Sequence, residues 1–217
     1  MKLNNQKLKK NNRISDSKEK IKIHIIGAGV SGLIAAKVLE ESGYSPTLIE
    51  SSNDVGGRIK TFIKNGYQID IGFQVLLTEY PQAKKHLDYK ALHLQKLVSG
   101  ACVFIKNKQF IIGNPIRNIS LLIPTLFSDI GTVKDKLKIF KLYLYLRFKS
   151  IEKIFLSKEL KTIVYLENYG FSKKIINNFF KPFFAGIFLE TELSTSSRMF
   201  EFVFKMFAQG DVAIPES

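Results

Sequence analysis

The sequence is poor in cysteine, tryptophan and acidic residues: it has one Cys, no Trp, and 19 Asp and Glu against 33 Lys and Arg. A single cysteine, Cys102, excludes an internal disulfide framework and fits a reducing compartment. Cys102 lies in the apolar run 101–105, so we expect a small buried residue there. No apolar run reaches the length of a membrane span, and no apolar signal segment stands near the N-terminus. These absences favour a cytoplasmic protein.

The shortage of acids leaves a formal net charge of +14, which would suit an anionic membrane or a nucleic acid. The basic residues are dispersed, however, over residues 1–20 and over the segment 134–181. Zinc-ligand spacing, an RNA-binding aromatic strand and a basic zipper are all missing, so we expect no nucleic-acid partner. Solvated surface charge is the first interpretation, and contact with a membrane surface is the second. Residues 1–20 are expected to form a disordered basic leader.

The segment after this leader has the pattern of a βαβ unit. Residues 21–26 form a β-branched run typical of a buried strand, and a glycine-rich turn follows at 27–32. Residues 33–40 have the composition of a helix that Gly43 would end. Residues 46–50 then form a second short strand, which completes the unit.

Hairpin and helix signals fill the next stretch. Two extended runs, 58–63 and 67–71, surround an Asn-Gly pair, the strongest local signal for a hairpin. Thr78 could cap a helix that runs to about residue 88, and residues 92–97 alternate like a half-buried strand. Residues 101–105 and 109–112 predict a second hairpin.

The chain becomes mostly helical from Pro115 onward. Thr132 and Asp135 resemble a capping box. A stripe with helical spacing follows, and it consists of Leu137, Phe140, Leu144, Phe148, Ile151 and Phe155. We expect this stripe to face the core, as in an ordinary amphipathic helix; the alternative is that the basic helix 134–156 lies on a membrane. Further helices are expected at 158–168, 172–180 and 196–208.

The glycine-rich turn matches the pattern GxGxxG. Gly27 allows a tight turn, Gly29 lets a pyrophosphate approach the backbone, and Gly32 lets the helix pack closely on the strand. The start of the helix offers free N–H groups to the phosphates. Glu50 ends the second strand 21 residues after Gly29, where it could bind ribose hydroxyls. The expected contacts of the turn are Gly27, Ala28, Gly29, Val30, Ser31 and Gly32.

The run from Glu50 to Arg58 resembles the signature of FAD-dependent amine oxidases, protoporphyrinogen oxidases and carotenoid (phytoene) desaturases. Gly56, Gly57 and Arg58 follow the acidic residue as they do in these flavoproteins, and the resemblance extends over residues 21–73. It implies that the dinucleotide is FAD. Flexible glycines would let the loop pass close to the ligand, and Arg58 would offer its donors to a phosphate or the flavin edge. The expected cofactor site also includes Ser51, Gly72 and Phe73.

The patterns together predict an α/β fold: a Rossmann-like FAD-binding βαβ unit with β-hairpin insertions, followed by a mostly helical, partial substrate domain. The expected boundaries are 1–20 for the leader, 21–75 for the cofactor-binding part and 76–217 for the substrate domain. No metal site is expected, since the histidines have no ligands at metal spacing. No catalytic set of nucleophile, base and acid can be identified.

The resemblance implies an oxidoreductase that removes hydride from a C–N or C–C bond of a small substrate. The first interpretation of the 18 phenylalanines is ordinary core packing, and the alternative is an apolar interior for a lipophilic substrate. Members of this superfamily have much longer chains, in which a C-terminal segment returns to the FAD domain. The alternative is therefore a truncated, non-catalytic fragment, or a subunit that needs a missing C-terminal half.

Overall fold

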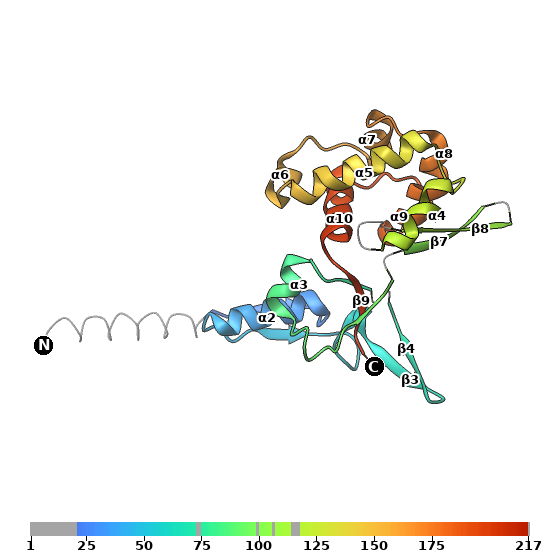
Figure 1. Ribbon diagram of the computed structural model, residues 1–217. Helices are drawn as coiled ribbons and strands as arrows, with labels where there is room; N and C mark the ends of the chain where they lie inside the picture. The colour runs from blue at the N-terminus through green and yellow to red at the C-terminus, as the bar shows by residue number, and fades with distance from the viewer. Residues whose placement is uncertain (1–20, 73–74, 99, 106, 114–117, 217) are drawn as a thin grey trace, which may run out of the picture. The chain divides into compact units, whose positions relative to one another are not determined.

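The computed structural model describes residues 21–72, 75–98, 100–105, 107–113 and 118–216 (Figure 1). The chain divides into two units, the first ending at Gln74 and the second spanning Val75–Glu216. The expected leader, residues 1–20, lies outside the described residues. The predicted fold class is confirmed: a Rossmann-like βαβ unit with a hairpin comes first, and a mostly helical unit follows.

The first unit opens with the predicted βαβ arrangement. Strand β1 (His24–Ile26) leads through the glycine turn into helix α2 (Val30–Glu41), and β2 (Thr47–Ile49) pairs with β1 in parallel. Gly43 follows the helix with φ of +83°, and the amide of Tyr44 bonds to the carbonyl of Leu39 at 3.0 Å. This left-handed ending satisfies carbonyls of the last turn, as Gly43 predicted.

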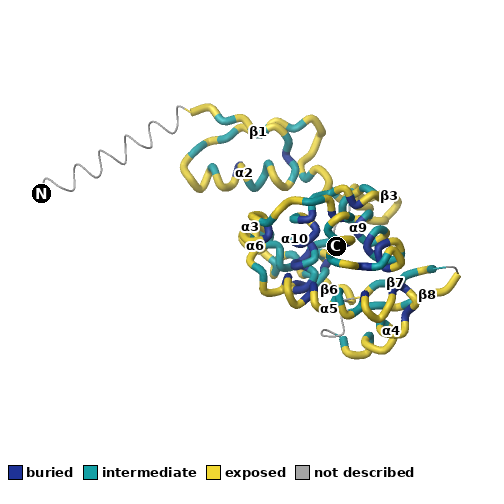
Figure 2. Tube along the Cα trace, turned by 90° about the horizontal axis from the view of Figure 1, so that it is seen from above, coloured by how far each residue is buried: buried dark blue, intermediate teal, exposed yellow. Residues whose placement is uncertain are grey.

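The strands of this unit are shorter and more exposed than their sequence suggested. Ile26 is 88% exposed and Ile49 is 50% exposed, so the prediction of a buried strand is wrong. Figure 2 shows few buried residues along β1 and α2. Parallel sheets are normally covered on both faces. In the described part of this unit, one α-helix accompanies the two-stranded sheet of β1 and β2, which is too little material to bury that sheet.

A hairpin follows the βαβ elements, as the Asn-Gly pair predicted. A short 3₁₀ turn, η1 (Gly57–Ile59), precedes β3 (Thr61–Lys64), which pairs antiparallel with β4 (Tyr67–Asp70). Asn65 and Gly66 connect the strands with φ of 52° and 80°. Two successive left-handed residues form the turn that matches the natural twist of a hairpin.

The second unit begins with strands from distant parts of the chain. Strand β9 (Val212–Ile214) lies between β5 (Leu76–Leu77) and β6 (Gln95–Lys96) and is antiparallel to both. The predicted cap by Thr78 is wrong, because its hydroxyl accepts a hydrogen bond from the amide of Asp211 at 2.9 Å. Helix α3 (Pro81–His86) begins later instead, with proline in its first turn.

The second predicted hairpin is formed by β7 (Gly100–Ile105) and β8 (Lys108–Gly113). Val103 and Phe110 are a cross-strand pair that packs against the hydrophobic core. Cys102 lies on the opposite face, where it is exposed, together with Phe104 at 72% exposure. The prediction of a buried cysteine is therefore wrong: strand alternation directs its side chain outward, although its neighbours are apolar.

Helices make up the rest of this unit (Figure 1). In chain order they are η2 (Ile119–Leu121), α4 (Leu122–Phe127), α5 (Val133–Phe148), α6 (Ile151–Leu156), α7 (Thr162–Asn168), α8 (Lys173–Ile175), the π-helical turn η3 (Ile176–Phe180), α9 (Lys181–Phe188) and α10 (Ser197–Gln209). Phe180, Phe184 and Phe200 are fully buried at their centre, and their rings contact one another. None of the helices in the described ranges is long and apolar enough to cross a bilayer.

Helix α5 packs through a different face from the predicted one. Leu142 and Leu146 are completely buried, whereas Leu137 is 63% and Phe148 is 81% exposed. Of the six predicted stripe residues, only Ile151 packs against the core. The prediction is wrong because α5 carries apolar residues on two opposite faces, and periodicity alone does not say which of them packs.

A buried carboxylate and a buried ion pair hold these helices together. Asp135 completes the predicted capping box with Thr132, and it also accepts bonds from the amide and hydroxyl of Ser172 at 2.9 and 2.7 Å. Burial raises the pKa of Asp135, but the hydrogen bonds from Ser172 and Thr132 outweigh this effect and hold the pKa at about 2. Farther along, Nζ of Lys149 lies 2.6 Å from Oε2 of Glu201, and their side chains are only 10% and 5% exposed. The pair connects the end of α5 to α10.

Candidate cofactor-binding site

The glycine turn links β1 to α2 in the geometry that a phosphate-binding loop needs. The amide of Gly27 donates to the carbonyl of Ile49 at 2.7 Å, and its φ of +93° turns the chain out of the strand. Gly29 is the N-cap of α2 and supplies no side-chain cap, and the first turn contains no acidic residue. The N–H groups of a first helical turn have no partner within the helix and point outward, toward any anion placed there.

The three glycines of the motif meet different surroundings. A Cβ at Gly32 would lie 2.0 Å from the carbonyl oxygen of Gly27, so only glycine permits this close approach of helix and turn. A Cβ at Gly27 or Gly29 would meet no atom within 4 Å. Gly32 therefore serves the packing of helix and strand, as predicted from the motif, whereas Gly29 adjoins open space. A glycine with open space beside it would let a diphosphate approach the backbone.

Glu50 is held against the glycine turn by its carboxylate. Its Oε2 accepts a hydrogen bond from the amide of Ala28 at 2.7 Å, and its Oε1 accepts one from the amide of Ser52 at 2.9 Å. These bonds, that of Ser52 first, lower the pKa of Glu50 to about 2. The carboxylate is thus ionised at neutral pH and suited to accept bonds from sugar hydroxyls beside the turn.

The second glycine pair runs alongside the first motif. The amide of Gly56 donates to the carbonyl of Ala28 at 2.9 Å, and Gly29 and Gly56 form a parallel bridge. Gly56 and Gly57 have φ of 108° and 56°, and a Cβ at Gly57 would lie 3.2 Å from Cα of Gly29. Residues 27 positions apart in sequence are therefore in backbone contact. Their left-handed angles and this closeness require glycine.

Arg58 and Gly72 lie at the end of the same loop. A Cβ at Gly72 would lie 2.3 Å from the carbonyl oxygen of Arg58, so the need for glycine here comes from a backbone contact within the protein. Arg58 is exposed and occupies η1 rather than the start of the expected extended run. Phe73 lies outside the described residues.

The remaining predicted residues are peripheral to these contacts. Val30 and Ser31 are exposed in the first turn of α2, and the hydroxyl of Ser51 is 3.4 Å from Oε1 of Glu50. Sequence reasoning missed Ser52, whose amide is a main partner of Glu50. A serine two residues after a carboxylate is a turn signal that could have indicated it. Within the described residues, no three His, Cys, Asp or Glu side chains gather as a metal site would require.

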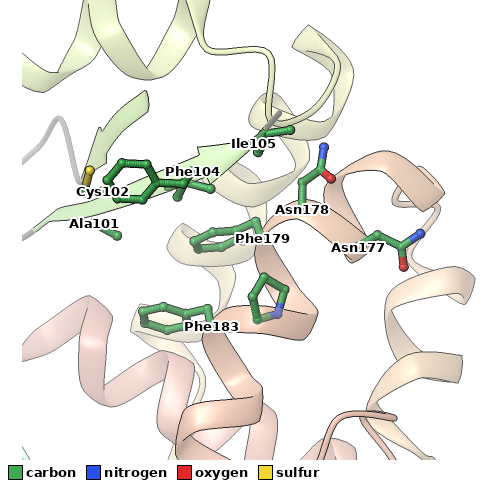
Figure 3. A pocket seen from close by; sticks show the side chains of 10 residues that line it. Ala101, Cys102, Phe104, Ile105, Asn177, Asn178, Phe179 and Phe183 are labelled. Carbon is green, nitrogen blue, oxygen red and sulfur yellow. The ribbon is translucent and has the colours of Figure 1, made fainter. Parts of the chain in front are cut away.

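The second unit contains a hollow of about 370 Å³ between β7 and the segment formed by η3 and α9. Figure 3 shows Phe179 and Phe183 projecting toward β7, and their rings stack with centres 5.4 Å apart. Asn177 and Asn178 lie at one side of it. An interrupted helix such as η3 frequently occurs at a functional site. The hollow suits a mainly apolar ligand with a hydrogen-bonding group.

Residues 25–89 match the family model described as an NAD(P)-binding Rossmann-like domain. An L-amino-acid oxidase from Sistrurus catenatus edwardsii is 35% identical over 89 residues, which are 40% of this chain and 17% of that protein. A possible lysine-specific histone demethylase 1 from Drosophila melanogaster is 44% identical over 59 residues, or 27% of this chain and 7% of that one. In its first part the chain is therefore similar to members of the FAD-dependent oxidoreductase superfamily. The cofactor that this relationship implies is FAD.

Similarity of fold to solved structures extends through both units. An oxidoreductase from Methanosarcina mazei has a TM-score of 0.62 at 21% identity over 90% of this chain and 46% of its own. Putrescine oxidase bound to putrescine has a TM-score of 0.58 at 18% identity, with 89% and 45% covered. A putative protoporphyrinogen oxidase from Exiguobacterium sp. 255-15 has a TM-score of 0.54 at 17% identity, with 90% and 48% covered. The chain thus spans about half the length of these solved structures.

Proposed function

We propose that the chain binds FAD through its first unit and serves an oxidation in which hydride leaves a C–N or C–C bond of a small substrate. The observation that carries the proposal is the meeting of three elements: the turn at Gly29, the loop at Gly56 and the carboxylate of Glu50. Each is separate in sequence, and each provides a different part of a dinucleotide site.

Different residues would bind different parts of the cofactor. Gly27 to Gly32 would hold the diphosphate at the start of α2, and Glu50 would bind the ribose hydroxyls. Arg58 would donate to a phosphate or to the flavin edge, with Gly56 and Gly57 keeping the loop close to the ligand. Ser51, Gly72 and Phe73 complete the proposed site. FAD, when bound, supplies the hydride-accepting chemistry, and the protein supplies binding and orientation.

A titration of the purified full chain tests this assignment. We expect FAD to bind with saturable quenching of flavin fluorescence, and NADH to compete only weakly. Tighter binding of NADH than of FAD would overturn the choice of cofactor. Binding of neither dinucleotide by the folded chain would count against the site itself.

The substrate that we propose is small and lipophilic. Support comes from the hollow beside β7, where Phe179, Phe183 and Pro182 provide an apolar lining and Asn177 a polar group. Reduction of the bound flavin by candidate amines, with and without long apolar substituents, would test this preference. Equal reduction rates across the series would contradict it.

A second candidate function is cofactor binding without independent turnover, as in a subunit that works with another polypeptide. The exposure of Ile26 and Ile49 on the paired strands favours it, since a parallel sheet is ordinarily covered on both faces. A chain that binds FAD, yet whose flavin no substrate reduces, would support this reading. Direct reduction by an amine would eliminate it.

We also propose peripheral membrane contact at the cytoplasmic side. This contact would use the surface of helix α5 and not the cofactor site.

A further inference from the structure

The outward face of α5 carries a continuous apolar stripe. Its members are Val133, Leu137, Phe140, Leu144 and Phe148, which are 58%, 63%, 45%, 37% and 81% exposed. Their spacing of three or four residues places them along one side of the helix. The core contacts of α5 lie on the opposite side, at Leu142 and Leu146, so the stripe is not needed for packing within the unit. Contiguous exposed apolar surface of this kind marks an interaction site.

Basic residues border this stripe. Lys134 and Lys141 are exposed and, by helical periodicity, lie along one flank, and Arg147 is exposed along the other. The only acidic residue of α5 is Asp135, which is 2% exposed and bonded to Thr132 and Ser172. The outward face of the helix is therefore apolar along its centre and positive at its edges. An amphipathic helix that lies in the surface of an anionic bilayer has this arrangement.

A hollow lies beside the stripe. It has a volume of about 440 Å³ and is lined by Lys138, Lys141, Tyr145, Asn168 and Tyr169. Nζ of Lys138 donates to the carbonyl of Gly170, which fixes this cation at the hollow. Lys138 and Lys141 are the cationic residues of this lining, and a phosphate oxygen accepts hydrogen bonds from ammonium groups of this kind. Its position next to the apolar stripe is where the headgroup of a lipid would lie if the stripe entered the acyl layer.

We propose that the stripe of α5 docks on an anionic lipid bilayer and that the neighbouring hollow takes a lipid headgroup phosphate. Charge complementarity selects the bilayer over an apolar protein partner, because the cations on both flanks and at the hollow would all face the headgroup layer. The proposal uses only residues of the second unit and does not depend on the binding of FAD.

Flotation of the full chain with vesicles tests the proposal. One vesicle preparation contains phosphatidylcholine alone, and the other contains equal parts of phosphatidylcholine and phosphatidylglycerol. We expect flotation with the anionic vesicles, little with the neutral ones, and progressive release as salt rises. Absence of flotation with both preparations, or equal flotation with both, would overturn the proposal.

Two pairs of variants identify the surface. Leu137→Ser with Phe148→Ser should weaken vesicle binding at least about 100-fold, since each side chain loses its burial in the acyl layer. The matched control is Ile63→Ser with Tyr67→Ser on the β3–β4 hairpin, where both residues are 74% exposed. This control should bind as the wild type does. Equal losses in both pairs would refute the role of the stripe.

Charge reversal tests the flanks in the same way. Lys134→Glu with Lys141→Glu should weaken binding at least about 30-fold, because each lysine near an anionic surface contributes about fivefold. Lys37→Glu with Lys85→Glu changes the net charge by the same amount at exposed positions on α2 and α3. An equal loss in that control would refute a local role of the α5 lysines.

Circular dichroism of each variant establishes that it is folded, and size-exclusion chromatography reports its oligomeric state. A wild-type oligomer that the stripe variants convert to monomers, with unchanged flotation, would make the stripe an interface between copies and refute the proposal.

Discussion

Gly29 gives the sharpest test of the cofactor site, because alanine there alters the space for the ligand and not the fold. The backbone at Gly29 has φ of −72° and ψ of 177°, which alanine adopts readily, and a Cβ would meet no atom within 4 Å. Gly29→Ala should therefore leave the free energy of unfolding within about 0.5 kcal/mol of the wild type. The added methyl group would stand in the space that we assign to the diphosphate. A misfit of that size costs about 1–3 kcal/mol, or about 5- to 150-fold in Kd for FAD.

Gly32→Ala is the matched comparison, and it should disturb the fold itself and not only the space for the ligand. Its Cβ would lie 2.0 Å from the carbonyl oxygen of Gly27, so α2 must move away from the turn. We expect destabilisation by about 1–3 kcal/mol or more, with FAD binding lost as the turn deforms. Urea unfolding followed by circular dichroism measures stability, and flavin fluorescence measures binding. Wild-type FAD affinity in a folded Gly29→Ala variant would refute the placement of the diphosphate.

Three further variants test the polar contacts. Glu50→Gln should weaken FAD binding about tenfold or more in calorimetric titration, because a charged acceptor is replaced by a neutral one; an unchanged affinity would contradict its role. Asp135→Asn should lose about 2 kcal/mol of unfolding free energy at neutral pH, the equivalent of lowering its pKa from 3.8 to about 2. Because the pKa of Asp135 is lower in the folded state, the wild type has the full stabilisation at a pH above the ordinary pKa of 3.8 and loses it as the pH falls through about 2. A pH series on the variant should lack that loss. Glu201→Ala should cost about 3–5 kcal/mol in urea unfolding by leaving the buried Lys149 ammonium without its partner, and replacing both by apolar residues should recover most of it.

Local chemistry explains what the sequence could predict. The Asn65-Gly66 turn, the Thr132–Asp135 capping box and the glycine motif before α2 each depend on a few adjacent residues with strong conformational preferences. Their geometry is decided within one turn of chain, so the pattern predicts it well. Glu50 was predictable for a similar reason, because the end of a strand beside this turn leaves a side chain there little choice of position.

Contacts between distant segments were not predictable in this way. Strand β9 joins β5 and β6 across more than a hundred residues, and Thr78 bonds to Asp211 instead of capping a helix. The proximity of Gly56 to Gly29 depends on how the loop folds back, although the family resemblance implied that both serve the cofactor. Short strands with few residues carry too little pattern to specify their partners.

Helix α5 shows how a correct helix assignment can still give the wrong surface. Its sequence satisfies two apolar stripes at once, one through Leu142 and Leu146 and one through Leu137 and Phe148. Packing against α10 decided between them, and the polar anchors are consistent with that choice: Asp135 is buried with Ser172, and Lys149 reaches Glu201. Neither anchor could form if the helix were rotated to bury the other stripe. The part of the predicted core stripe that lies on α5 is thereby left outward, between basic residues, and this makes α5 a candidate for membrane docking.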